Sequence, residues 1–267
     1  MPYVPLSGDA GRIHVCAHRG HSVGAPENTI PALDAAAARR ATVAEIDVVL
    51  TADDEIVLLH DEILDRTTDG RGPVAALELA AIRRLDAGAW FGPAFAGTPI
   101  PTLGEALAAA RRHGMGLLVE IKERRRADLM IERLARFIED ERAADDLLVI
   151  SFDHVSLVRM RERLPSVRTE LITHARHVEI AAIARRAAAA SVSIEWNMFH
   201  PDDADALHAE GIAVRVTLPG PEKLALGRSY GFDDEARCRA HLAAGRIDVL
   251  AGDDTAFTRA MVDSARS

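Results

Sequence analysis

The segment IHVCAHRG, residues 13–20, decides between the two α/β folds that this sequence could adopt. Its first five residues form a short apolar run that is typical of a buried strand, and an amphipathic stretch at 29–40 follows. In an open doubly wound sheet, the turn after the first strand carries the phosphate-binding pattern G-x-G-x-x-G. Here the strand ends in His18-Arg19-Gly20, without that pattern. The segment therefore favours a closed barrel over the open sheet.

The same unit, a strand-like run followed by a helical stretch, occurs eight times along the chain. The strand-like runs are 13–17, 43–50, 116–121, 147–151, 167–172, 191–195, 213–217 and 247–251. The helical stretches are 29–40, 103–113, 127–142, 155–164, 178–190, 202–210, 234–244 and 255–265. Strict alternation predicts parallel strands joined by right-handed crossovers. Eight units in 267 residues match the size of an α/β fold of the (β/α)8 TIM-barrel type, which we expect to form one domain over residues 1–267.

One connection, between the second strand and the next barrel helix, is much longer than the others. An apolar run at 55–59 leads to His60, and residues 61–101 then hold a turn-rich cluster, a predicted helix near 77–85 and the aromatic pair Trp90-Phe91. Connections of this length are commonly functional, and the active sites of TIM barrels lie on the loops that follow strands. We therefore predict a small cap insertion at about 61–101 over the barrel mouth, with a surface insertion of no function as the alternative.

Composition and charge narrow the class of function. The chain is 48% hydrophobic and 27% charged, which excludes a disordered or fibrous protein. The balance of 32 basic against 41 acidic residues gives a net charge of −9, so general attraction to nucleic acid or to an anionic bilayer is not expected. The sequence has two cysteines, no apolar run of membrane-spanning length and no signal pattern, so we expect reduced thiols and a cytoplasmic protein.

Acidic residues stand at the ends of two predicted strands. Glu45-x-Asp47 and Glu120-x-Lys122 follow a period of two, which places each pair on one face of its strand. Because these strands are neighbours in a barrel, the three carboxylates can meet, and a proton or a cation must then offset their repulsion. Ligands with oxygen atoms alone suit Mg²⁺ or Ca²⁺ better than zinc. The alternative is a set of salt-bridged acids paired with Lys122 and Arg19.

His18 and His60 are the candidate proton-transfer pair. One histidine ends the first strand and the other opens the long connection, so both reach the barrel mouth. Cleavage of a phosphodiester needs a base for the attacking hydroxyl and an acid for the leaving oxygen, and histidine titrates near neutral pH. Arg19 could grip the non-bridging oxygens of a phosphate, and Glu27 could brace Arg19 or a histidine. Asp61 either orients an imidazole or caps a turn.

An ordered series of motifs over residues 15–122 resembles the glycerophosphodiester phosphodiesterases. The motifs are His18-Arg19-Gly20, Pro26-Glu27-Asn28-Thr29, Glu45-x-Asp47, His60-Asp61, Leu64-x-Arg66-Thr67-Thr68-x-Gly70, Leu85-Asp86-Ala87-Gly88-x-Trp90-Phe91, Ile100-Pro101-Thr102-Leu103 and Glu120-Ile121-Lys122. The resemblance implies a TIM barrel with a short cap and a divalent metal held by Glu45, Asp47 and Glu120. It further implies His18 and His60 as the acid–base pair, with Arg19 and Lys122 against the phosphate. The implied reaction converts a deacylated phospholipid, such as glycerophosphocholine, to glycerol 3-phosphate and an alcohol.

The C-terminal half follows the family less closely. The seventh strand ends in Val216-Thr217-Leu218-Pro219, where the family typically has a Trp-Thr-x-Asn-like stretch, and the eighth ends in Gly252-Asp253-Asp254-Thr255 without the usual proline. These departures concern the wall expected to hold the alcohol or glycerol part. Trp90, Phe91 and Trp196 are the predicted substrate contacts, Trp196 with packing at the barrel mouth as its alternative. A loop at 218–231 could form a second rim, with Arg215 and Arg228 as anion contacts.

Several functions therefore stay open. The substrate could be a lysophospholipid or a sugar phosphodiester in place of a small glycerophosphodiester. The nucleophile could be water or the substrate's own glycerol hydroxyl, and either histidine could be the base. A barrel that binds a phosphorylated ligand without turnover is a rival of another class. A different metal-dependent barrel hydrolase would predict zinc and more metal-spaced histidines than His18 and His60 supply.

Overall fold

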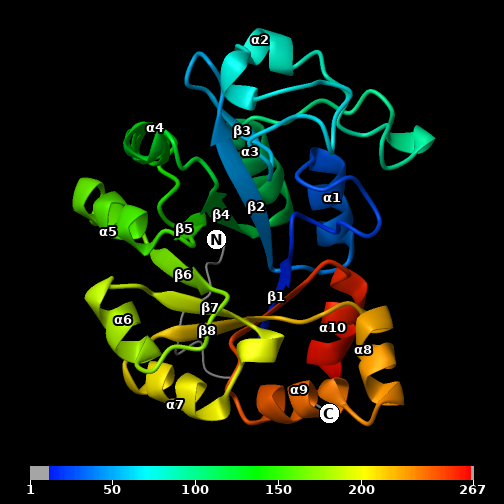
Figure 1. The fold of residues 1–267 in the computed structure, drawn as a ribbon, viewed down its shortest axis with the longest axis vertical. Coiled ribbons are helices and arrows are strands. Elements are labelled where there is room, and N and C mark those ends of the chain that lie inside the picture. The colour runs from blue at the N-terminus through cyan, green and yellow to red at the C-terminus, as the bar shows by residue number, and fades with distance from the viewer. Residues whose placement is uncertain (1–11, 266–267) are drawn as a thin grey trace.

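Eight parallel strands close into a barrel in the computed structural model, which describes residues 12–265 (Figure 1). The barrel strands are β1 (His14–Ala17), β2 (Val43–Leu50), β4 (Gly116–Ile121), β5 (Leu147–Ser151), β6 (Thr169–Thr173), β7 (Ser191–Glu195), β8 (Ala213–Thr217) and β9 (Val249–Gly252). β1 pairs with both β2 and β9, through Cys16 opposite Val43 and Ala251, which closes the ring. The predicted TIM barrel is confirmed.

Helices cover the outside of the barrel with their apolar faces inward. The outer helices are α1 (Ile30–Ala38), α3 (Leu103–His113), α4 (Ala127–Asp140), α5 (His154–Arg163), α6 (Ile180–Arg186), α7 (Pro201–Ala209), α8 (Pro221–Ser229), α9 (Asp234–Ala243) and α10 (Thr255–Ser264). In α4, the helical spacing of Met130, Leu134 and Ile138 gives one buried face. Thr102 caps α3 in a reciprocal capping box with Glu105. Local sequence and tertiary packing therefore agree in these helices.

The register of β2 against β4 sets the position of the acidic residues. Asp47 lies opposite Glu120, and Glu45 lies opposite Leu118, in a parallel pairing. The alternating residues Ile46 and Val48 pack into the core between barrel and helices. The predicted period of two is confirmed, because it separates the acidic side chains from those that face the helices.

The long connection after β2 begins as a hairpin. β3 (Ile56–Leu58) pairs antiparallel with β2, and Leu59 N–H donates to the carbonyl oxygen of Asp47 at 3.1 Å. The rest of the insertion contains η1 (Val74–Ala76), α2 (Leu79–Ile82) and η2 (Pro93–Phe95), and it forms the upper end of the molecule in Figure 1. A separate apolar cluster holds it together, consisting of Val49, Val57, Leu59, Leu64, Val74, Ile82, Ala87 and Ile100. The helix predicted near 77–85 is shorter than expected, since α2 covers only its centre.

The loop expected at 218–231 is mostly a helix. α8 begins at Pro221, a residue whose fixed φ suits the first turn, and runs to Ser229. Leu224 is its only buried residue, so the segment lacks the apolar repeat by which a helix is recognised from sequence. The expectation of a loop is therefore wrong for residues 221–229. Within residues 12–265, no helix combines the length and the apolar character that crossing a bilayer requires.

Candidate active site

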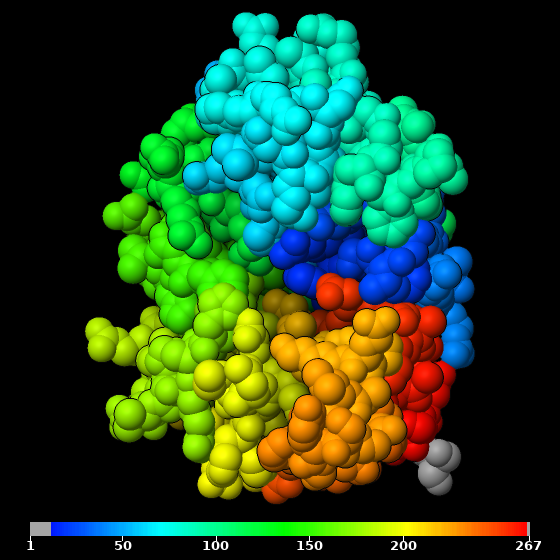
Figure 2. Space-filling view, turned by 45° about the vertical axis from the view of Figure 1, so that its right-hand side comes forward, coloured from blue at the N-terminus to red at the C-terminus, as the bar shows by residue number. Residues whose placement is uncertain are grey.

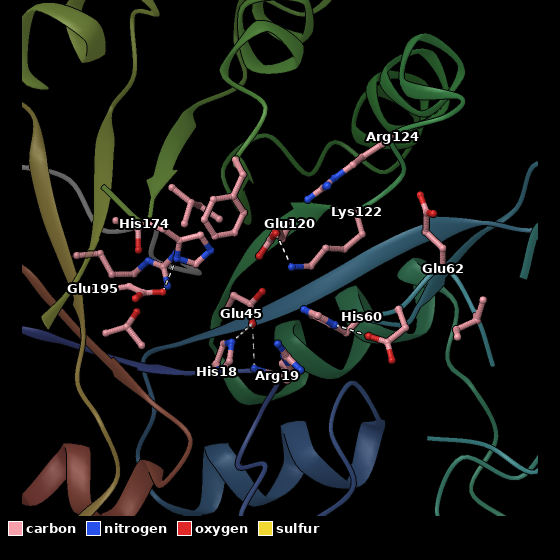
Figure 3. Close-up of a pocket in the computed structure, with 17 residues that line it drawn as sticks. His18, Arg19, Glu45, His60, Glu62, Glu120, Lys122, Arg124, His174 and Glu195 are labelled. Carbon is pink, nitrogen blue, oxygen red and sulfur yellow. Dashed lines mark hydrogen bonds and ion pairs between the residues drawn. The ribbon is translucent and has the colours of Figure 1, made fainter. Parts of the chain in front are cut away.

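A cavity of about 850 Å³ opens where the barrel strands end. Figure 2 shows the hollow near the middle of one face, between the blue, green and orange segments. Its lining includes six of the predicted site residues, namely His18, Arg19, Glu45, His60, Glu120 and Lys122. Figure 3 shows Glu45 and Glu120 centrally in this cavity, with His18, Arg19 and His60 close by. The structure therefore brings together residues that lie more than a hundred positions apart in the sequence.

Three carboxylates cluster at the base of this cavity, where Glu45 and Glu120 line it and Asp47 lies beneath its surface. One oxygen each of Glu45, Asp47 and Glu120 lies within 4.8 Å of the others, and all three side chains are buried. Asn28 fixes Asp47 twice, because its Nδ2 donates to Asp47 Oδ2 at 2.7 Å and its Oδ1 accepts from the Asp47 backbone N–H at 2.9 Å. Thr29, the next residue along the chain, is the N-cap of α1.

Two cations stand beside the acidic cluster. Lys122 Nζ lies 2.5 Å from Glu120 Oε1 and 3.2 Å from Asp47 Oδ1. Arg19 Nε lies 3.3 Å from Asp47 Oδ2, and the Arg19 backbone N–H donates to Glu45 Oε2 at 2.9 Å. The ion pairs named as an alternative are therefore present. Two cations against three carboxylates still leave the cluster with an excess of negative charge.

The three carboxyl groups respond differently to burial and charge. Burial, reinforced by the charge of Asp47, raises the pKa of Glu45 to about 8. Burial also raises the pKa of Glu120, although Lys122 opposes this shift. Burial acts in the same direction on Asp47, but Lys122 and Arg19 outweigh it and lower the pKa of that carboxyl. Of the three carboxylates, Glu45 is thus the one whose negative charge is most poorly compensated by the cations nearby.

The donor atoms of the cluster fit a divalent metal ion. Glu45 Oε1 and Asp47 Oδ1 are buried and accept no hydrogen bond, although Lys122 lies within ion-pair distance of the latter. An unsatisfied buried polar atom costs roughly 1–3 kcal/mol, and a cation bound by these oxygens would offset that cost. Carboxylate oxygens are the ligands that Mg²⁺ and Ca²⁺ prefer. This buried acidic triad could therefore hold a metal ion.

His18 is oriented by an acid at the end of the last strand. Its Nδ1 donates to Asp253 Oδ1 at 2.6 Å, and its Nε2 lies 4.0 Å from Glu45 Oε2. Burial lowers the pKa of His18, but the hydrogen bond to Asp253 and the charge of Glu45 produce a net rise. Sequence reasoning did not assign Asp253 to His18. The signal was available, because the last strand of a closed barrel must lie beside the first.

His60 is held from the cap side by a chain of charged groups. Its Nδ1 donates to Asp61 Oδ1 at 2.7 Å, and Arg66 Nε donates to Asp61 Oδ2 at 2.7 Å. Arg66 also binds Glu27 through two hydrogen bonds of 2.8 Å, and Glu27 accepts a 2.9 Å bond from Arg19. The hydrogen bond from Arg66 lowers the pKa of Asp61 to about 2. Asp61 therefore orients an imidazole, and Arg66 links His60 to Arg19.

The backbone around Arg19 is strained. Arg19 and Asn28 both have a backbone φ of 57°, in the left-handed region that residues other than glycine adopt much less often. The Asn28 N–H donates to the Arg19 carbonyl oxygen at 3.0 Å, which ties the two residues together. Gly20 has φ of 81°, and a Cβ there would lie 2.6 Å from the Ala32 side chain. Glycine is thus required by both conformation and space.

The opposite wall of the cavity comes from the later strands. His174 stacks on Phe152 with ring centroids 4.2 Å apart, and its Nδ1 lies 2.5 Å from Glu195 Oε1 (Figure 3). Arg215 lines the cavity from a fully buried position, where its Nη2 lies 2.7 Å from Glu170 Oε1. Sequence reasoning named Arg215 as an anion contact, but a buried carboxylate already pairs it. Arg228 instead pairs with Glu235 and is absent from the cavity lining.

The predicted aromatic contacts lie in different places. Trp90 and Phe91 meet edge to face in the cap, with centroids 5.6 Å apart, and neither is among the residues that line the cavity. Trp196 stacks on Phe199 at 5.8 Å and lines an adjoining cavity. The structure therefore separates the cap aromatics from the carboxylate cavity and places Trp196 in the adjoining one. The direction in which residues 90 and 91 point could not be predicted from the sequence, because the cap has no regular repeat.

Comparisons with known proteins agree with this geometry. YhdW of Bacillus subtilis (strain 168), provisionally named a glycerophosphodiester phosphodiesterase, is 42% identical over 161 residues, which are 60% of this chain and 66% of that protein. The glycerophosphodiester phosphodiesterase of Caldanaerobacter subterraneus is 37% identical over 163 residues, 59% of this chain and 65% of that protein. The matches thus span less than two thirds of these relatives.

A solved structure and a family model extend the likeness over more of the chain. An Oleispira antarctica phosphodiesterase, solved in complex with its product sn-glycerol 3-phosphate, superposes with a TM-score of 0.80 at 29% identity. The alignment covers 94% of this chain and 96% of that one. Residues 18–219, which include the carboxylate cluster and both histidines, match the model of the glycerophosphoryl diester phosphodiesterase family. The chain belongs to the glycerophosphoryl diester phosphodiesterase family.

Proposed function

We propose that this protein hydrolyses glycerophosphodiesters to glycerol 3-phosphate and an alcohol, with Mg²⁺ or Ca²⁺ at the three carboxylates. One observation carries the proposal: Glu45, Asp47 and Glu120 meet within 4.8 Å beside a cavity that His18 and His60 line. Names of relatives support it, and the Oleispira antarctica enzyme holds sn-glycerol 3-phosphate. A catalytically silent barrel would have no use for two oriented imidazoles beside an under-neutralised acidic cluster.

The phosphate binds where positive charge is fixed. Arg19 and Lys122 line the cavity and are already anchored by carboxylates, so neither must be ordered when an anionic diester enters. Glu45, Asp47 and Glu120 would hold the metal ion, which when bound supplies Lewis-acid stabilisation of the phosphate's charge. The buried setting strengthens both interactions, because little water remains to screen them.

The two histidines move protons. One imidazole takes a proton from the attacking hydroxyl, whose oxygen bonds to phosphorus, and the other gives a proton to the leaving oxygen as its P–O bond breaks. The Nδ1 of each histidine is hydrogen-bonded to a carboxylate, that of Asp253 for His18 and that of Asp61 for His60. The Nε2 of each ring is therefore left to exchange a proton with the substrate or the nucleophile. Both water and a glycerol hydroxyl of the substrate satisfy this scheme. Trp90 and Phe91 have no part in it.

A substrate screen tests the proposal. Glycerophosphocholine, glycerophosphoethanolamine, a sugar phosphodiester and a lysophospholipid are each incubated with the purified protein, and the products are followed by ³¹P NMR. We expect glycerol 3-phosphate from the first two substrates with added Mg²⁺ or Ca²⁺, and none after chelation. Metal binding by calorimetry without turnover of any diester would indicate a silent binding barrel. Activity restored by zinc alone would indicate a different class of hydrolase.

A further inference from the structure

A second cavity of about 650 Å³ adjoins the carboxylate cavity, and we call it the groove. His18, Glu195 and Thr217 line both cavities, so the two spaces meet beside the candidate proton donor or acceptor. Asp253, the hydrogen-bond partner of His18, lines the groove as well. The volume lies within the ~300–1,000 Å³ range of small-molecule sites. A group attached to a phosphate at the carboxylates can therefore extend past His18 into the groove.

The far side of the groove is apolar and exposed. Leu226, Tyr230 and Phe232 are 59%, 75% and 65% exposed, and they form what we call the apolar rim. Of the eight large hydrophobic side chains that are exposed in the described residues, these three alone gather within seven positions. Scattered exposed apolar residues are ordinary, but a cluster beside a site marks a contact surface.

The floor beneath the apolar rim is firmly built. Leu218 and Leu224 are buried there, and Trp196 is stacked on Phe199 with the Arg237 guanidinium 5.3 Å from its ring centroid. Backbone hydrogen bonds of 3.0 Å from Tyr230 and Phe232 to Gly227 hold the turn after α8. The apolar surface is therefore presented by fixed backbone positions, in a cavity that His18 also lines.

We propose that the groove binds a hydrocarbon chain of the substrate. The protein would then act on phosphodiesters that carry one such chain, which are amphiphiles of the lysophospholipid class. The proposal rests on the proposed phosphodiesterase function and extends it. A small polar alcohol finds its hydrogen-bond partners in the first cavity, where Glu62, His174 and Glu195 stand, and leaves the groove unused. A hydrocarbon chain gains from leaving water at each methylene that contacts the rim.

A chain-length series tests the groove. We compare kcat/KM for glycerophosphocholine with the values for its hexanoyl, octanoyl and decanoyl esters, each kept below its micelle concentration. We expect kcat/KM to rise with chain length by several fold per pair of methylenes until the groove is filled. The triple variant Leu226→Ser/Tyr230→Ser/Phe232→Ser should lower the decanoyl-to-unacylated ratio about tenfold or more. A ratio that is flat in the wild type, or equal in the variant, overturns the proposal.

Matched controls separate the possible causes. Val178→Ser removes a fully exposed apolar side chain that lines neither cavity, and should leave the ratio unchanged. The single variant Phe232→Ser should show a smaller loss in the same direction if the triple variant unfolds. Sedimentation with phosphatidylcholine vesicles is measured in parallel. If the triple variant loses vesicle binding while its chain-length ratio stays at the wild-type value, the rim contacts lipid surfaces and the proposal fails.

A binding measurement distinguishes failure of the groove from failure of the proposed function. Calorimetry compares decyl phosphate with glycerol 3-phosphate, and neither ligand requires turnover. Tighter binding of decyl phosphate that the triple variant loses supports the groove even if no diester is hydrolysed. Turnover of glycerophosphocholine together with equal binding of both ligands upholds the proposed function and rejects the groove.

Discussion

The two walls of the cavity are built on different principles. The wall from β1, β2, β4 and the loops after them consists of polar and charged side chains, many of them buried, that are joined by hydrogen bonds such as Asp47 with Asn28 and Glu27 with Arg66. The wall from β7, β8 and α8 ends in the apolar rim, whose side chains extend into solvent. The first wall is set by strand register, whereas the second depends on one helix and the turn that follows it.

From this difference we infer that, in the proposed function, the reaction and the choice of substrate depend on separate parts of the chain. A change in the polar wall disturbs several partners at once, since its hydrogen bonds form one network. A change in the apolar rim removes contact area and leaves that network intact. Variants of the polar wall should therefore affect all diesters alike, and the experiments below test whether that is so.

The largest loss is expected from Glu45→Gln. The amide keeps the shape of the side chain but removes the buried oxygen charge that a metal ion requires, so activity should fall to background on short and acylated diesters alike. Calorimetric titration with Mg²⁺ and Ca²⁺ should lose its binding signal. Glu132→Gln, an exposed carboxylate on α4, is the control and should retain both. Full metal binding by Glu45→Gln would contradict the assignment of the ligands.

His18→Ala and His60→Ala should each lower kcat by at least ~10² with little change in melting temperature. Both imidazoles lie at the cavity surface, where their removal leaves no packing void in the core. His113→Ala removes an imidazole–carboxylate pair with Asp34 outside the cavity, and turnover should be unaffected. If both cavity variants keep their turnover, the acid–base assignment is wrong and the contrast between the walls disappears.

Arg66→Ala should lower kcat about tenfold, because His60 and Arg19 both lose their brace through Asp61 and Glu27. Arg66 is a positioning residue, so KM for a short diester should change less than kcat, and Arg66→Lys should restore part of the loss. The matched control is Arg71→Ala in the same cap loop, whose Nη1 is 3.5 Å from Asp65 Oδ1. A change confined to stability would show that the brace serves folding alone.

The smallest effect is expected from Asp253→Asn. The hydrogen bond from His18 to Asp253 helps raise the histidine's pKa, so its loss should move the pKa of His18 downward. NMR titration of the imidazole in metal-free protein measures this directly. As pH rises, His18 then loses its proton at a lower pH than in the wild type, and the corresponding limb of the pH–rate profile should shift toward lower pH. An unchanged His18 titration would refute the pairing.

Much of the polar wall was predictable because it depends on short-range rules. A period of two places Glu45 and Asp47 on one face, and adjacency of β2 to β4 adds Glu120. The hydrogen bond between Asp253 and His18 was not predicted, because the two residues lie 235 positions apart and meet only once the barrel closes. α8 was not predicted as a helix, because a helix with a single buried residue has no apolar repeat. The position of Trp90 and Phe91 depends on how the irregular cap folds, which no local pattern encodes.

Arg19 and Asn28 carry a consequence for engineering the protein. A left-handed residue other than glycine costs roughly 1–3 kcal/mol, and Arg19→Gly or Asn28→Gly would relieve that backbone strain. Those replacements would relax the loop and discard the side chains that fix Asp47. The cost of leaving Asp47 without these partners is of the same size as the backbone strain relieved, so glycine at either position should lower turnover without a clear gain in melting temperature.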